Sequence, residues 1–242
     1  MDYTPYENFA KEKLGFEFND ISLLVTALTH RSYVNEHKTA HDHNERLEFL
    51  GDAVLELVSS DFLYRNFKEP EGVMTAIRAA LVRTESIGDA GMALGYEPVV
   101  RMSKGEKQGS ERAHDVILAD CFEAVIGAIY LDQGYETAKE FIAKNILSKT
   151  DAILEEGSWR DPKSYVQELA QKVDGVTPVY RTLSEEGPDH DKMFTVGLYV
   201  GTTLIGKGTG HSKQEAQTMA AREGVKKYHV EGKAPKIQRV KK

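Results

Sequence analysis

The sequence predicts two domains, an all-α domain over residues 1–154 and a small α+β domain of element order α-β-β-β-α over residues 161–230. In the first domain the apolar residues recur at helical spacing, whereas strand-like runs appear only in the second. A polar, turn-rich break over 155–160 separates the two patterns, and we interpret it as a linker. Residues 231–242 form a basic tail.

The first domain is predicted to be a series of helices. Asn19 or Asp20 can cap a helix that ends at Leu28. A long helix includes residues 44–52 and ends near 67–70, where the residue before proline disfavours helix. Three more helices are predicted, over 75–93, 116–131 and 135–154, with a loop over 105–110.

The second domain begins with a helix over 162–173, which has proline in its first turn. Three strand-like runs follow, over 177–183, 193–200 and 202–207. Ser212 and Glu215 have the spacing of a capping box, which predicts the start of a last helix that continues through Tyr228.

The charge is divided unevenly along the chain. The net charge of −7 by itself argues against a nucleic-acid partner. From Ser158 onward, however, 15 basic and 10 acidic side chains give +5, which leaves −12 for the part before it. An acidic first part and a basic second part suit a cation-binding domain joined to a domain that holds a polyanion.

The composition gives no sign of secretion or of a membrane partner. Cys121 is the single cysteine and cannot form an internal disulfide, and we expect a small core residue there rather than a nucleophile. Residues 1–16 lack the apolar run of a signal peptide. The most apolar stretch, 116–131, is too short to span a bilayer and contains two acids. We therefore expect a cytoplasmic protein.

Carboxylates lie within strongly apolar sequence on two of the predicted helices. Four of them fall within about 80° of one another on the first helix: Glu45, Glu48, Asp52 and Glu56. On the second helix Asp120 and Glu123 are three residues apart and share a face. If the helices pack together, these acids converge, and each like-charged pair at about 4 Å repels by roughly 4 kcal/mol.

Such a cluster requires protonation or bound cations. Oxygen ligands suit Mg²⁺, with Mn²⁺ able to substitute, rather than zinc. The alternative is an acidic stripe on a solvated helix, and the apolar neighbours on both helices argue against it. Gly51 costs about 1 kcal/mol relative to alanine in mid-helix, so we interpret it as a notch that lets another backbone approach.

Residues 44–55, Asn-Glu-Arg-Leu-Glu-Phe-Leu-Gly-Asp-Ala-Val-Leu, resemble the signature of the bacterial ribonuclease III family without a gap. Other stretches resemble the same family, so that the resemblance covers nearly the whole chain: 27–33, 70–72, 78–82 and 117–132. It implies a helical nuclease domain that dimerises, followed by a double-stranded-RNA-binding domain. It also implies the roles of the acids: Mg²⁺ ligands Glu48, Asp120 and Glu123, catalytic carboxylates Asp52 and Glu123, and Glu45 at the edge of the site with Asp52.

RNA-binding domains of this type cover about 16 base pairs and touch two minor grooves and the phosphates between them. Gln167 and Glu168 on the first helix of the domain can hydrogen-bond 2′-hydroxyls. His190, in the loop over 187–190, is a candidate for the second minor groove, and Lys213 for phosphate at the start of the last helix.

This chain departs from the family at the start of that last helix. Where the family usually shows paired lysines before the alanine of the helix, this chain has Lys213-Gln214, and Gln217 follows. The loss of a phosphate partner predicts weaker binding with a flatter salt dependence. The basic tail over 231–242 could compensate.

The acids predict metal-assisted hydrolysis of a phosphodiester. Divalent ions would activate a water for in-line attack and neutralise the charge on the leaving 3′-oxygen, which gives 5′-phosphate and 3′-hydroxyl ends. A homodimer would supply two sites for the two strands and leave short 3′ overhangs. The dimer is supported indirectly, because the predicted signature helix has more apolar surface than one small domain needs to bury. The resemblance implies ribosomal RNA precursors as substrates, together with structured messenger, transfer or small RNAs.

Two other classes of function remain open. One is an RNA-binding regulator without catalytic activity, and the presence of all four expected acids argues against it. The other is a metal-dependent hydrolase of small phosphate esters whose second domain serves assembly. Cleavage of duplex RNA in the presence and absence of Mg²⁺ separates these classes.

Overall fold

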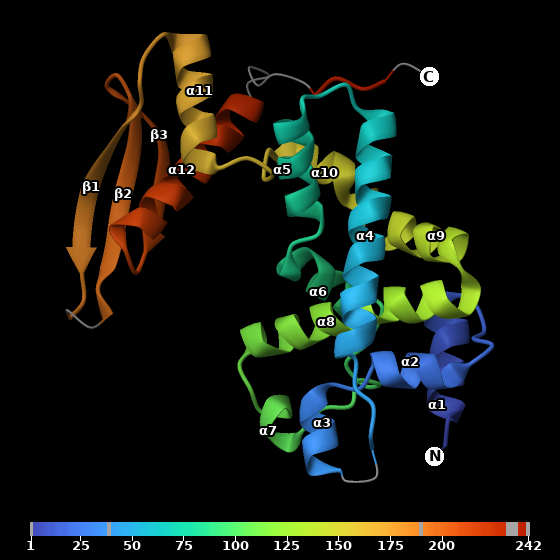
Figure 1. Ribbon diagram of the computed structural model, residues 1–242. Coiled ribbons are helices and arrows are strands. Elements are labelled where there is room, and N and C mark those ends of the chain that lie inside the picture. The colour runs from blue at the N-terminus through green and yellow to red at the C-terminus, as the bar shows by residue number, and fades with distance from the viewer. Residues whose placement is uncertain (1, 38–39, 189–190, 231–236, 241–242) are drawn as a thin grey trace. The chain divides into compact units, whose positions relative to one another are not determined.

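The computed structural model describes residues 2–37, 40–188, 191–230 and 237–240 (Figure 1). By its internal contacts the described chain divides into two compact units. One extends from the N-terminus to Thr150 and includes Val240, and the other covers Asp151–Arg239. Across these described ranges, no helix combines the length and the apolar character that a membrane crossing requires.

The first unit is helical, as predicted. Its helices are α1 Thr4–Phe9 with a π-helical turn over Ala10–Leu14, α2 Ile21–Ala27, α3 Arg31–Glu36, α4 Glu45–Asn66, α5 Glu71–Leu81, α6 Thr84–Ala93, α7 Lys104–Lys107, α8 Glu111–Gln133, α9 Tyr135–Asn145 and a 3₁₀ turn over Leu147–Lys149. Helix α10, Thr150–Glu156, contains the boundary between the units. The predicted cap is confirmed, because Asp20 Oδ1 accepts a hydrogen bond of 3.0 Å from the amide of Ser22.

Helix α8 lies at the centre of the first unit and contacts α2, α4, α6 and α9. Figure 1 shows it crossing α4 steeply. Two glycines stand at this crossing. A Cβ at Gly51 would lie 1.7 Å from the carbonyl oxygen of Glu123, and one at Gly127 would lie 2.3 Å from the carbonyl oxygen of Leu47. The notch predicted at Gly51 is confirmed, and α8 supplies its other half.

Two predicted helices are interrupted in the structure. The helix expected over 75–93 is two helices, α5 and α6, because Arg83 has extended backbone angles. Since α5 packs on α4 while α6 packs on α8, the chain must turn between them. The helix expected over 135–154 breaks at Ile146, which is fully buried at the turn.

The loop expected over 105–110 is helical in its first part, where α7 runs to Lys107. Ser103 caps this short helix, because its hydroxyl accepts a hydrogen bond of 3.1 Å from the amide of Glu106. The Ser-x-x-Glu spacing of a capping box was present in the sequence at this point.

The second unit has the predicted order α-β-β-β-α. It consists of α11 Pro162–Asp174, β1 Val179–Glu186, β2 Met193–Val200, β3 Thr203–Gly210 and α12 Lys213–Val230. The strands form an antiparallel sheet in the order β1-β2-β3. Both helices and the central strand contribute to its core: Tyr165, Val166, Leu169, Ala170, Leu198, Ala220, Ala221, Val225 and Tyr228.

Strand β3 is longer than the run predicted over 202–207. Its last residues alternate glycine with other types, a composition that is unusual in strands. The reason is close packing, since a Cβ at Gly206 would lie 2.2 Å from the carbonyl oxygen of Ala220, and one at Gly208 would lie 2.2 Å from its amide nitrogen. The missing side chains let α12 lie directly on the strand.

The last helix begins at the predicted capping box. Ser212 Oγ accepts a 3.1 Å hydrogen bond from the amide of Glu215, and the Glu215 carboxylate accepts one of 2.8 Å from the amide of His211. The break predicted over 155–160 is partly ordered within the second unit. Residues up to Glu156 complete α10, and Trp159 is buried with the guanidinium of Arg160 4.3 Å from the centre of its ring.

Candidate active site and RNA-binding surface

The crossing of α4 and α8 positions the predicted acids. Glu45 and Glu48 lie in the first turn of α4, and Asp52 follows on the same face. The backbone of Glu123 is packed against Gly51 of α4. The side chain of Glu123 therefore leaves α8 beside the acidic side chains of α4. Glu48, Asp120 and Glu123 are half-buried, whereas Asp52 and Glu45 are exposed.

The ionisation of the acids shows that they influence one another. Burial, followed by the charges of Asp52, Glu48 and Asp120, raises the pKa of Glu123 to about 8. Burial, followed by the charges of Asp120, Glu45 and Asp52, raises the pKa of Glu48 to about 7. The pKa of Asp120 is raised as well, chiefly by burial. The structure therefore brings together the carboxylates that the sequence singled out.

The side chains of these acids do not converge on one point. In the parts of the chain that the structure describes, no three His, Cys, Asp or Glu side chains stand close enough together to hold a metal ion. Like charges favour such separation. Their oxygen donors and the excess negative charge nevertheless fit a hard divalent cation.

Basic groups around the acids were not assigned by the sequence. The amide of Asn44, just before α4, donates a hydrogen bond of 2.9 Å to the carbonyl oxygen of Thr29, which holds the segment before α3 against the start of α4. As a result Arg31 pairs with Glu45 at 3.2 Å, and the charge of His30 offsets part of the rise that burial causes in the pKa of Asp120. His30 and Arg31 belong to the stretch 27–33 that resembles the family. That resemblance was the feature of the sequence from which their place beside the acids could have been predicted.

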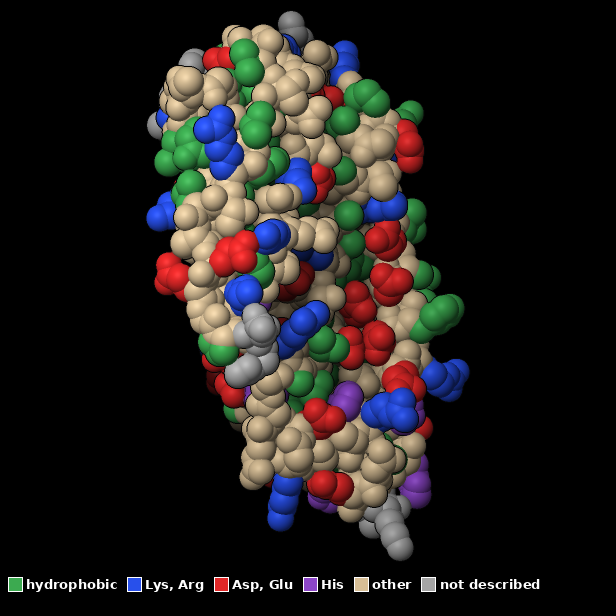
Figure 2. Space-filling view, turned by 90° about the vertical axis from the view of Figure 1, so that its left-hand side faces the viewer, with side chains coloured by type: hydrophobic (Ala, Val, Ile, Leu, Met, Phe, Trp, Pro, Cys, Tyr) green, Lys and Arg blue, Asp and Glu red, His purple; other side chains and the backbone are tan. Residues whose placement is uncertain are grey.

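A second ion pair lies further along the acidic face of α4, at Glu56. Arg78 of α5 pairs with Glu56 at 2.8 Å and donates a hydrogen bond of 2.7 Å to the hydroxyl of Ser60. Glu56 also contributes to the raised pKa of Glu123. Figure 2 draws one face of the protein, on which Asp and Glu side chains gather along a column.

Cys121 lies next to Asp120 but belongs to the core. It is fully buried, burial raises the pKa of its thiol, and the side-chain amide of Asn44 lies 3.6 Å from its sulfur. A thiol with a raised pKa is a poor nucleophile, so the expectation of a small core residue is confirmed.

The predicted RNA contacts lie on the helices of the second unit. Gln167 and Glu168 are exposed on α11, and Glu168 pairs with Arg160 at 3.3 Å. Lys213 begins α12 and pairs with Glu185 of β1 at 2.7 Å. His190 lies outside the described residues, as do the tail lysines at 233, 236, 241 and 242.

A helical unit with clustered acids on two crossing helices, joined to a unit of order α-β-β-β-α, defines a hydrolase class that carries its own nucleic-acid-binding domain. Comparisons with known proteins agree. A family model described as Ribonuclease-III-like matches residues 20–150, and one described as double-stranded RNA binding motif matches residues 162–228.

The chain is 43% identical over 210 residues to Ribonuclease 3 of Protochlamydia amoebophila, which covers 86% of each chain. It is 42% identical over 228 residues to Ribonuclease 3 of Desulforamulus reducens, which covers 93% of this chain and 92% of that one. A solved nuclease domain of ribonuclease III from Campylobacter jejuni, described with flexibility in the region involved in dimer formation, matches with a TM-score of 0.51 and 40% identity. That match covers 57% of this chain and 96% of that one.

The chain therefore belongs to the ribonuclease III family, and it is an endoribonuclease that acts on double-stranded RNA. Enzymes of this family are generally metal-dependent.

Proposed function

We propose that this chain is a Mg²⁺-dependent endoribonuclease that cuts both strands of duplex RNA as a homodimer, with Mn²⁺ able to substitute. The observation that carries the proposal is the cluster of half-buried acids at the α4–α8 crossing. Glu48 and Glu123 have raised pKa values because burial and neighbouring acids both oppose their charge. A divalent cation at this place relieves that repulsion.

Glu48, Asp120 and Glu123 would hold the ion, and Glu45 would stand at the edge of the site, where Arg31 positions it. To share one ion these side chains have to turn toward one another from the separated orientations of the structure. A bound Mg²⁺ supplies a nucleophilic water at neutral pH and neutralises charge on the phosphate.

Asp52 and Glu123 would be the catalytic carboxylates. Asp52 is exposed, so its oxygens are accessible to the attacking water and to the scissile phosphate. Glu123 is half-buried and fixed by the packing of its backbone on Gly51, so it can hold the orientation of the reacting groups. With water as the nucleophile the RNA 2′-hydroxyl is a recognition group, and the products carry 5′-phosphate and 3′-hydroxyl ends.

The homodimer is supported by an apolar stripe on α4. Phe49, Leu57 and Tyr64 are 81%, 58% and 75% exposed, although large apolar side chains are usually buried. Their spacing of eight and seven residues places them on one face of the helix. This surface is the apolar excess that the sequence indicated.

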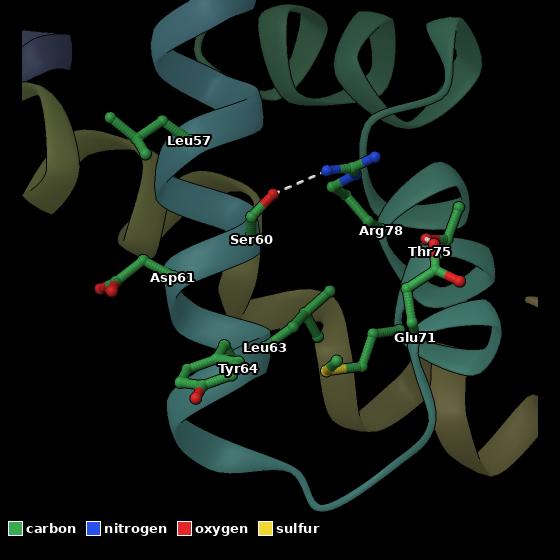
Figure 3. A pocket seen from close by; sticks show the side chains of 9 residues that line it. Leu57, Ser60, Asp61, Leu63, Tyr64, Glu71, Thr75 and Arg78 are labelled. Carbon is green, nitrogen blue, oxygen red and sulfur yellow. Dashed lines mark hydrogen bonds between the residues drawn. The ribbon is translucent and has the colours of Figure 1, made fainter.

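A pocket of about 470 Å³ adjoins this stripe between α4 and α5. Figure 3 shows Leu57 and Tyr64 on the α4 side and Glu71, Thr75 and Arg78 on the α5 side. An apolar side chain from a second copy could enter it, which makes the stripe and the pocket complementary parts of one interface. Two copies provide one site for each strand, which would leave short 3′ overhangs.

The decisive experiment is incubation of a defined RNA hairpin with the chain in Mg²⁺ and in EDTA, followed by sizing and end analysis of the products. We expect cuts on both strands in Mg²⁺ only, with 5′-phosphate and 3′-hydroxyl ends. Binding without cleavage would indicate a regulator without catalysis. Activity on a nucleotide monoester without activity on duplex RNA would indicate a small-ester hydrolase.

The natural substrates that we propose are cytoplasmic ribosomal RNA precursors and other transcripts with long duplex stems, including structured messenger, transfer and small RNAs. The support is the duplex-binding domain, because an A-form duplex is recognised mostly by its shape and its 2′-hydroxyls. Cleavage of a precursor stem at fixed positions, compared with an unrelated stem of equal length, tests this part.

A further inference from the structure

Lys163 on α11 reaches across to α12. Its ammonium donates a hydrogen bond of 2.8 Å to the side-chain oxygen of Gln217, and it lies 5.4 Å from the centre of the Tyr180 ring. Both Lys163 and Gln217 are half-buried, so the contact is built into the packing of the two helices. The polar partner of this ammonium is a neutral amide.

Lys213, the lysine at the start of α12, has a different environment. It pairs with the carboxylate of Glu185 at 2.7 Å, and this hydrogen bond lowers the pKa of Glu185. A phosphate that binds Lys213 has to compete with that carboxylate. Lys163 forms no ion pair in the described part of the chain, although its charge helps to lower the pKa of Asp161, so no carboxylate holds its ammonium as Glu185 holds that of Lys213.

The position of Lys163 joins two parts of the expected RNA surface. It precedes Gln167 by four residues on α11, so the two side chains share a face of that helix. Gln217 in turn follows Lys213 by four residues on α12. The ammonium of Lys163 therefore lies between the exposed amide of Gln167 and the first turns of α12, where amide groups and the helix dipole favour an anion.

We infer that Lys163 binds a backbone phosphate of duplex RNA beside the first turns of α12, and that Gln217 positions its ammonium for this contact. Lys163 supplies from the neighbouring helix a positive charge that Gln214 and Gln217 do not provide. This inference rests on the duplex binding of the second unit, and it adds a residue and a position to it.

The test measures the affinity of the full chain for a short RNA duplex in EDTA over a series of KCl concentrations. Each phosphate contact contributes roughly 0.7 to 0.9 to the slope of log affinity against log salt. We expect Lys163→Gln to reduce the slope by about one contact and to weaken binding roughly three- to tenfold at moderate salt. Lys172→Gln, a neutralised lysine further along the same helix, is the matched control and should change neither quantity.

A second pair of variants separates phosphate binding from packing. Lys163→Arg keeps the charge and should keep the slope. Lys163→Gln combined with Gln217→Lys places an ammonium on the other partner of the same contact, and we expect it to restore most of the lost slope. If both bind as weakly as Lys163→Gln, the residue acts through packing and the inference fails.

Failure of this inference is distinguishable from failure of the proposed function. If the unmodified chain binds no duplex RNA, the proposed function is wrong. If it binds duplex RNA and Lys163→Gln has the same slope and affinity as Lys172→Gln, only the role of Lys163 is overturned.

Discussion

Glu123 combines three constraints in one residue. It is half-buried, it faces the charges of Asp52, Glu48 and Asp120, and its backbone oxygen fills the notch at Gly51. A carboxylate in such a place is unfavourable for folding by itself. Its position at the α4–α8 crossing is therefore better explained by a function that requires negative charge than by stability.

We expect Glu123→Gln to reduce cleavage of duplex RNA by at least roughly a hundredfold while binding stays within about twofold, because the substitution removes charge and preserves shape. Single-turnover cleavage and duplex affinity measure the two effects. Glu111→Gln, in the exposed first turn of the same helix, is the control. A parallel loss of binding would mean that Glu123 is a structural acid.

The raised pKa values also predict how stability depends on pH. Glu48 and Glu123 have pKa values of about 7 and about 8 in the folded chain against 4.5 in the unfolded one, so the folded state binds more protons in this range. Protonation of these two carboxyl groups therefore adds to the free energy of unfolding. This contribution is fully present below about pH 4.5 and is lost as the pH rises through 7 to 8.

In EDTA the unfolding temperature of the unmodified chain should therefore fall relative to that of Glu123→Gln between pH 5.5 and about 8. Added Mg²⁺ should remove most of the difference. Thermal unfolding at several pH values in EDTA and in Mg²⁺ measures it. Curves for the two proteins that stay parallel across this range would contradict the assignment of the raised pKa to Glu123.

At the scale of elements, the crossing of α4 and α8 determines both the core and the site. The two glycines let the helix backbones meet, and the same contact sets the places of the acids. The middle of α8, from Ile117 to Ile129, is largely buried, while α4 buries one face and exposes an apolar stripe on another. Any change that separates these helices should affect stability and catalysis together.

Gly51→Ala tests this coupling. Its methyl group would lie 1.7 Å from the carbonyl oxygen of Glu123, so the helices have to move apart, and we expect a loss of about 2–3 kcal/mol in the free energy of unfolding with reduced cleavage. Gly72→Ala, in the first turn of α5 with nothing within 4 Å of its new Cβ, should be neutral or stabilising by up to about 1 kcal/mol. Chemical denaturation and cleavage rates compare the two; equal stability of both variants would contradict the close packing.

At the scale of the whole molecule, one helical unit offers one cluster of acids, and a duplex has two strands. The exposed apolar stripe on α4 lies on the same helix as Glu48 and Asp52, so association through it would place two clusters near each other by symmetry.

We expect Leu57→Glu to shift the chain from dimer to monomer, because a charge in the centre of an apolar interface is costly to bury. Sedimentation equilibrium measures the mass, and a hairpin with both strands labelled shows whether paired cuts become rare. Met92→Glu introduces the same charge at a side chain that is 54% exposed on α6, outside the stripe, and should leave the mass unchanged. An unchanged mass for Leu57→Glu would exclude this face as the interface.

The sequence by itself determined what short-range signals carry. The spacing of Glu45, Glu48 and Asp52 placed them on one face of a helix, and caps such as Asp20 and Ser212 marked where helices begin. The clustering of Asp120 and Glu123 with them followed from the expectation that two strongly apolar helices pack together. These properties depend on helical periodicity and on hydrogen bonds between residues two to four positions apart.

Only the tertiary structure decided the rest. The breaks at Arg83 and Ile146 arise because successive helices pack on different partners, which local propensity does not encode. The ion pair of Arg31 with Glu45 and the bond of Lys163 to Gln217 join segments that are 14 and 54 residues apart. Such contacts are set by how elements pack against one another, because the chain spacing that fixes helical faces carries no information about which faces meet.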